Sequence, residues 1–304
     1  MILIYEGVDI SEDVVVNKCV NDMRIDGFPD AVRLVLADDG TWDAWFPRFG
    51  ERFVARNGQA DSGLMHIHAV EPGSGVYVLR ASSVPLDMEQ TARSGTWEDV
   101  TLSLLAQEIA ARNGLQYVPQ PFEDRCYDLV VQEHQPDLAF LRHRCLLEGL
   151  SFVVLDQRLV LFDLARIEAQ EPACIIGAGD SDARYALTED AAGSYGACEV
   201  SNGAIVGKAQ SATGPAHRTL YVSLYERIAS IGEANRYAEN LLADANRRAR
   251  RGVIWSDTLQ DGLAAGSVIH LNAPYARSWT GKALVWRIRH DYILERSKLF
   301  VRPI

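Results

Sequence analysis

The chain has 304 residues, which is long enough for two or three domains. Of these residues 48% are hydrophobic and 23% are charged, a composition typical of a globular protein. Its formal net charge of −11 argues against specific nucleic-acid binding, which depends on lysine and arginine contacts with phosphates. No run reaches the roughly 18 apolar residues of a membrane span. The first residues hold Glu6 and Asp9 rather than the basic start of a secretory signal.

The cysteines are few and widely scattered. Their number is odd and no CxxC spacing occurs, which argues against a disulfide framework or a metal-binding pair. We therefore expect buried, reduced thiols in a reducing compartment. The five are Cys19, Cys126, Cys145, Cys174 and Cys198.

Residues 1–90 have the pattern of short β-strands. Val32, Leu34 and Leu36 share one face, which is the period-two pattern of a half-buried strand, and Asp39-Gly40 then supplies a turn. Strands spaced by about ten residues, with a turn signal after each, favour a barrel or sandwich. Three further strands are expected at residues 51–56, 64–70 and 76–81.

The middle of the chain changes to a helical period. Thr101 is a suitable N-cap for a helix that ends at Gly114, and Thr96 with Asp99 offers an alternative start. The pattern predicts a small α/β unit of two helices and a hairpin. After the first helix, it places a second helix at residues 137–149 and strands at 152–155 and 159–162.

From about residue 166 the pattern again favours strands, interrupted by one long helix. That helix is expected at residues 232–251, where alanine, tyrosine and leucine form one apolar stripe and Gly252 follows. No repeat of 20–50 residues is visible. The strands are expected at residues 199–206, 219–224, 268–271 and 283–290.

The order of these elements resembles the hub family of phage tails and contractile injection machines. This family includes the phage late-control protein D-like proteins and the hub part of type VI secretion spike proteins. The resemblance is strongest where a Trp-x-Asp-x-Thr lead-in precedes one amphipathic helix and a second, "LAFLR…GL" helix follows. The matching segments are residues 31–40, 46–50, 96–115, 137–161, the helix before Gly252, 266–271 and 279–290, whereas residues 169–197 match nothing.

The resemblance implies a mainly β fold with an α+β insert. Two similar β-barrel tube domains would occupy residues 1–90 and 166–304, the second containing helix 232–251, with a small α/β domain at residues 91–165. Family members form trimers whose six barrels make a ring of pseudo-sixfold symmetry between a sixfold tail tube and a threefold spike. An acidic surface is also compatible with a channel through which DNA slides.

The resemblance also implies partners and a location. Because no spike domain follows the hub region before Ile304, we expect a separate spike chain. The other expected partners are two further copies in a homotrimer, a tail tube or distal tail protein, and the tape measure protein. The expected location is the virion tail, at the baseplate or tail tip, after assembly in the host cytoplasm. The alternatives are a cell-wall hydrolase and a host-binding tail-tip protein.

The sequence contains little that points to a metal-binding or catalytic site. His66 and His68 have a metal-ligand spacing but lack a third ligand, and His143 and Cys145 are two apart on a helix and cannot face each other. Adjacent carboxylates such as Glu98 and Asp99 point apart, and no nucleophile motif is present. We therefore expect no enzyme activity, catalytic residue, metal or cofactor.

One basic run remains as a candidate docking site. Arg247, Arg248, Arg250 and Arg251 lie at the end of the long helix, where cations face the negative end of the helix dipole. The alternative is a docking strip for an acidic partner ring, since charge complementarity guides assembly. Tryptophans are common interface anchors, but core packing is the expected role of Trp42, Trp45, Trp279 and Trp286.

Overall fold

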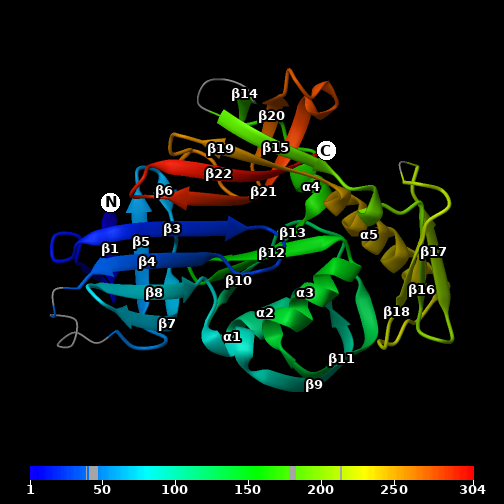
Figure 1. The fold of residues 1–304 in the computed structure, drawn as a ribbon. Helices are drawn as coiled ribbons and strands as arrows, with labels where there is room; N and C mark the ends of the chain where they lie inside the picture. Colours follow the sequence, from blue (N-terminus) through cyan, green and yellow to red (C-terminus); the bar gives the residue numbers. More distant parts are fainter. Residues whose placement is uncertain (39, 41–46, 178–182, 213) are drawn as a thin grey trace.

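A computed structural model describes residues 1–38, 40, 47–177, 183–212 and 214–304 of the chain (Figure 1). Strands predominate, as predicted, and fourteen of them form one main sheet that runs through both β-rich parts of the chain. Its N-terminal strands are β1 (Ile2–Tyr5), β2 (Val8–Asp9), β3 (Val16–Arg24), β4 (Ala31–Ala37), β5 (Arg52–Asn57), β6 (Ala60–Asp61), β7 (Met65–Gly73) and β8 (Val76–Ser82). Its C-terminal strands are β14 (Cys174–Gly177), β15 (Ala183–Glu189), β19 (Arg250–Ser256), β20 (Val268–Asn272), β21 (Gly281–Asp291) and β22 (Arg296–Pro303).

The two halves of the main sheet meet where β21 pairs antiparallel with β3. The order of eleven strands across the sheet is β15-β19-β22-β21-β3-β4-β8-β7-β5-β1-β2. Of the other three, β20 pairs with β21 and with β14, and β6 pairs with β5. Each half has its own hydrophobic core: Phe53 and Met65 lie in the first, Ile254 and Leu299 in the second. The predicted alternation in β4 is confirmed, since Val32, Leu34 and Leu36 are each 1% exposed and all belong to the first core.

The α/β unit packs its own core beside the main sheet. It contains α1 (Leu86–Gln90), β9 (Ala92–Thr101), α2 (Leu102–Arg112), β10 (Gln116–Val118), β11 (Cys126–Pro136), α3 (Asp137–Leu147), β12 (Leu150–Leu155) and β13 (Arg158–Asp163). Thr101 caps α2 by accepting a hydrogen bond from the Leu104 amide, and Gly114 and Gly149 follow the two helices with positive φ. These predicted helix ends are confirmed. The alternative start at Thr96 is wrong, because that residue pairs within the β9–β11 ribbon.

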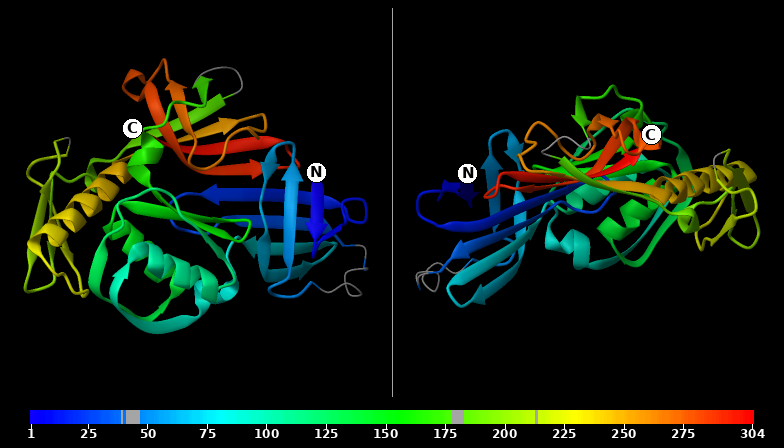
Figure 2. Two further views of the ribbon diagram at one scale, coloured as in Figure 1. Left: turned by 180° about the vertical axis from the view of Figure 1, so that it is seen from behind. Right: turned by 45° about the horizontal axis from the view of Figure 1, so that its top comes forward.

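A second small unit lies apart from the main sheet. Strands β16 (Ala197–Ser201), β17 (Val206–Gln210) and β18 (Thr219–Ser223) form a separate sheet, and α5 (Ile231–Ala249) packs against it. Val200 and Tyr237 lie in its core. Figures 1 and 2 show this unit at one end of the molecule, with α5 between its three-stranded sheet and the main sheet. We call it the peripheral unit; the other short helices are α4 (Leu164–Glu168), η1 (Ala191–Gly193) and η2 (Arg277–Trp279).

The peripheral unit changes two expectations. The strand expected at residues 199–206 is a hairpin, β16–β17, in which Gly203 takes a positive φ between the two strands. The long helix ends at Ala249 rather than at Gly252, which lies in β19. A Cβ on Gly252 would lie 2.6 Å from a Leu187 methyl. A glycine at this position therefore leaves the space that the Leu187 side chain occupies.

Residues 166–304 therefore hold two packed units, the second half of the main sheet and the peripheral unit. The division of the chain into domains at residues 90 and 165 stays a prediction. In the part of the chain that the structure describes, no helix is long and apolar enough to cross a membrane.

Candidate docking surfaces

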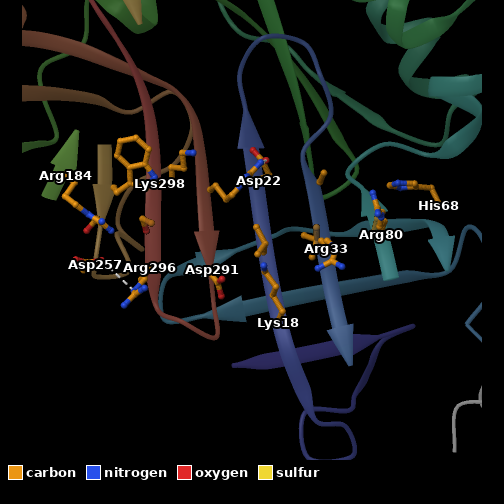
Figure 3. Close-up of a pocket in the computed structure, with 18 residues that line it drawn as sticks. Lys18, Asp22, Arg33, His68, Arg80, Arg184, Asp257, Asp291, Arg296 and Lys298 are labelled. Atoms are coloured by element: carbon orange, nitrogen blue, oxygen red, sulfur yellow. Dashed lines mark hydrogen bonds and ion pairs between the residues drawn. The ribbon is translucent and has the colours of Figure 1, made fainter. Parts of the chain in front are cut away.

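A cleft of about 570 Å³ crosses the main sheet and gathers basic side chains from both halves (Figure 3). On β3, Lys18 and Asp22 face this cleft, while Cys19 and Asn21 between them are buried. The strand period of two therefore separates the cleft residues from the core. We call its seven cations the basic belt: Lys18, Arg33, Arg80, Arg184, Arg289, Arg296 and Lys298.

The basic belt carries an excess of positive charge. Asp22, Asp257 and Asp291 also line the cleft, so seven cations against three carboxylates leave an excess of four positive charges. The chain as a whole has a net charge of −11. The cleft is therefore a local region of opposite sign on an acidic protein.

The strand register places like charges directly opposite each other. Arg33 on β4 pairs with Arg80 on β8, and Arg289 on β21 pairs with Lys298 on β22. Like charges in directly opposed positions destabilise a sheet. In the isolated chain, the repulsion between these like charges is therefore only partly compensated.

Some belt cations have partners and others do not. Arg80 forms an ion pair with Glu71 at 2.8 Å, and Arg296 lies 3.7 Å from Asp257. Lys18 and Arg33 are exposed, and neither has an ion pair among the described residues.

Asp22 is the best-held carboxylate in the cleft. It accepts hydrogen bonds from Arg287 and Arg289, with shortest distances of 2.6 and 2.5 Å. Burial raises the pKa of Asp22, but the two guanidinium groups lower it further, so its net pKa lies below the ordinary value. Asp22 belongs to β3 and both arginines to β21, so this cluster also ties the two halves of the main sheet together.

The predicted docking strip is divided in the structure. Arg247 binds Glu168 at 3.1 Å, and Arg248 binds Asp244 at 2.6 Å. Arg250 donates to the Ser278 carbonyl at 2.9 Å. Arg250 also lies 4.7 Å from the centre of the Trp279 ring. Arg251 is exposed.

Three of the four arginines share a second cleft, of about 430 Å³, where α5 and β22 approach the α/β unit. Arg247, Arg248 and Arg251 line it, whereas Arg250 does not. Sequence reasoning missed its other cations, Arg24, Arg142 and Arg302, because they come from distant elements. In the same cleft the Phe28 ring contacts two guanidinium groups, whose central carbons lie 4.5 Å (Arg24) and 3.9 Å (Arg142) from the ring centre.

Among the described histidines and cysteines, only His68 and Cys145 line either of the two clefts. A bulge between Ile67 and Ala69 shifts the register of β7 against β8 at His68, and both His66 and His68 are half-buried. Burial lowers the pKa of His66. His143 contacts Glu226. Within the described residues, no group of three His, Cys, Asp or Glu side chains could hold a metal ion.

The remaining sequence expectations concern burial. Trp279 is 7% exposed and packs in the second core, and Trp286 packs against a smaller cluster, as predicted. Trp42 and Trp45 lie outside the described residues. The prediction of buried thiols is correct for three cysteines but wrong for Cys126, which is exposed on β11, and Cys174 is half-buried.

Comparison with known proteins identifies the fold. No family model matches the sequence, and no curated protein matches it. Solved structures do match along almost the whole chain, and they are phage tail proteins and type VI secretion components. The chain therefore has the fold of these phage tail and type VI secretion proteins, and the resemblance predicted from the sequence is confirmed at the level of the fold.

Three of these structures illustrate the match. A 43 kDa tail protein of prophage MuSo2 from Shewanella oneidensis has a TM-score of 0.75 at 11% identity, over 99% of this chain and 96% of its own. A tail protein from Neisseria meningitidis gives 0.76 at 12% identity, over 99% and 95%. An E. coli type VI secretion component, described as similar to the phage T4 tail proteins gp27 and gp5, gives 0.62 at 12% identity, over 99% and 76%.

Proposed function

We propose that this chain is a structural, non-enzymatic protein of a phage or phage-like tail, where it forms the baseplate hub or tail-tip adaptor. The observation that supports this most is the fold shared with two phage tail proteins over 99% of the chain. The proposed location is the virion tail, after assembly in the host cytoplasm.

The proposed hub is a homotrimer that solves a symmetry mismatch. The main sheet consists of two halves, each with its own core, joined at β21 and β3. Three copies would present six such halves, arranged as a ring with threefold symmetry and near-sixfold shape. One side of the ring would then match a sixfold tail tube, and the other a threefold spike.

The proposed partners follow from this arrangement. They are a spike on a separate chain, a tail tube or distal tail protein, and the tape measure protein. Arg248 and Arg251 remain the proposed docking strip for an acidic partner, because both side chains are exposed, whereas Arg247 and Arg250 are half-buried against contacts within the chain. Replacing both with glutamate should weaken co-purification with the tail-tube protein made in the same cells. The variant Arg227→Glu, which alters another exposed cation, should leave it unchanged.

The proposal is tested by the native mass of the purified chain, measured by light scattering over a series of dilutions. We expect a mass near three times the 33.7 kDa of one chain, which persists on dilution because a closed ring buries two interfaces on each copy. A stable dimer or a monomer at every concentration would contradict the trimeric hub.

A further inference from the structure

We propose that the basic belt binds an extended acidic polypeptide segment of a partner chain. This inference goes beyond the proposed function, because a trimeric ring does not by itself require a ligand on this face of the main sheet. It rests on the charge, register and lining of the cleft in a single chain; Figure 3 shows the lining residues.

The first argument is electrostatic. Two cross-strand pairs, Arg33 with Arg80 and Lys298 with Arg289, oppose like charges. The exposed Lys18 and Arg33 have no ion pair among the described residues, so the negative charge that would balance them is not supplied there. A bound polyanion would relieve both repulsions and would be attracted by the local excess of four positive charges.

The second argument is shape. From Arg184 on β15 to Arg80 on β8, the belt crosses seven neighbouring strands. Strands lie about 4.8 Å apart, so six gaps span roughly 29 Å. An extended polypeptide rises about 3.3 Å per residue, so about nine residues would cover this length. The belt runs across the strands, so a segment lying along it would bind through side chains rather than as an added strand.

The third argument separates a polypeptide from a nucleic acid. Proteins that hold single-stranded nucleic acid use aromatic side chains on which the bases stack. Among the described residues that line the cleft, Trp255 is the only phenylalanine, tyrosine or tryptophan. The Lys298 ammonium lies 5.1 Å from the centre of its ring, so a cation already occupies that position. The cleft therefore offers many charges and little stacking surface, which favours carboxylates over bases.

The test uses two fluorescent probes of ten units each, deca-glutamate and a ten-nucleotide oligothymidylate. Each probe is titrated with the full chain in its native oligomeric state. Anisotropy would be followed at low and at physiological salt. The test variant is Lys18→Glu with Arg33→Glu, because both side chains are exposed and without ion pairs among the described residues. The control is Arg158→Glu with Arg166→Glu, which makes the same change of charge at exposed positions outside the cleft.

We expect wild type to bind deca-glutamate, the test variant to bind it at least tenfold more weakly, and the control to stay within twofold of wild type. Oligothymidylate of equal or higher affinity would show that the occupant is a nucleic acid. No binding of deca-glutamate, or equal loss in both variants, would overturn the site. If the glutamate variant fails to fold, Lys18→Gln with Arg33→Gln should give a smaller loss in the same direction. The native mass of each variant separates loss of binding from loss of the trimer.

Discussion

Replacing Asp22 with alanine probes the junction between the two halves of the main sheet. Asp22 on β3 accepts two hydrogen bonds from Arg287 at 2.6 Å, and two from Arg289 at 3.0 and 2.5 Å. Its side chain is 13% exposed, whereas the two arginines are 23% and 40% exposed. The substitution would leave two neighbouring guanidinium groups without their shared counter-ion.

The expected cost follows from these exposures. Removing one partner of a fully buried ion pair costs about 3–5 kcal/mol. Because both arginines keep contact with water, part of the interaction is screened, and we expect a loss of roughly 2–3 kcal/mol. A free-energy change of 1.4 kcal/mol corresponds to a factor of ten, so local opening of β21 and β3 should become roughly 30- to 150-fold more frequent.

Amide hydrogen exchange measures this opening strand by strand, which avoids assuming that all units unfold together. Exchange should accelerate in β21 and β3 and change little in α2 and α3. Asp257→Ala is the matched control, because its pair with Arg296 is 3.7 Å long and about half exposed. Such pairs contribute about 0–1 kcal/mol, or at most about fivefold in exchange. An acceleration below fivefold in β21 and β3 for Asp22→Ala would refute the proposed role of this cluster.

Two further substitutions test the smaller units. Asp137 is fully buried and accepts hydrogen bonds from Arg112 at 2.8 Å and Asn113 at 2.7 Å. Asp137→Ala should therefore destabilise α2 and α3 by about 3–5 kcal/mol, as measured by amide hydrogen exchange in these helices. Burial raises the pKa of Asp137, but these partners lower it further. The contribution of the Asp137 carboxylate to folding stability is therefore complete at pH 7 and is lost as the pH falls through that lowered pKa. The free energies of unfolding in urea of wild type and Asp137→Asn should accordingly converge in acid. A Cβ on Gly207 would lie 2.1 Å from the Ala234 carbonyl carbon, so Gly207→Ala should cost about 1–3 kcal/mol and speed proteolysis of the peripheral unit. The control is Gly262→Ala, where a Cβ meets nothing within 4 Å, and it should leave the rate of proteolysis unchanged. Equal rates of proteolysis in the two variants would contradict the close packing at Gly207.

The sequence predicted those elements whose pattern is local. The alternation in β4 and the Thr101 cap of α2 each depend on a few neighbouring residues, and both were found as expected. The strand β9 was missed because it alternates between exposed and half-buried residues around Gly95 and Glu98, without an apolar face. Gly252 was taken as a helix stop, although its real constraint is the Leu187 side chain, which the sequence does not place beside it.

The docking surfaces could be predicted only in part for the same reason. The arginine run at the end of α5 was visible because its four residues are contiguous, but its division between Trp279 on one side and the second cleft on the other depends on tertiary packing. The basic belt was not predicted. It gathers side chains from residue 18 to residue 298, and only the pairing of β21 with β3 brings them into one cleft.

Negative-stain electron microscopy of the purified chain, at a concentration where its mass has been measured, tests the trimeric hub most directly. Three copies, each with two sheet halves that have separate cores, should give end-on class averages of a closed ring with six similar lobes around an opening. A ring with another number of lobes, or compact particles without an opening, would contradict the proposed hub.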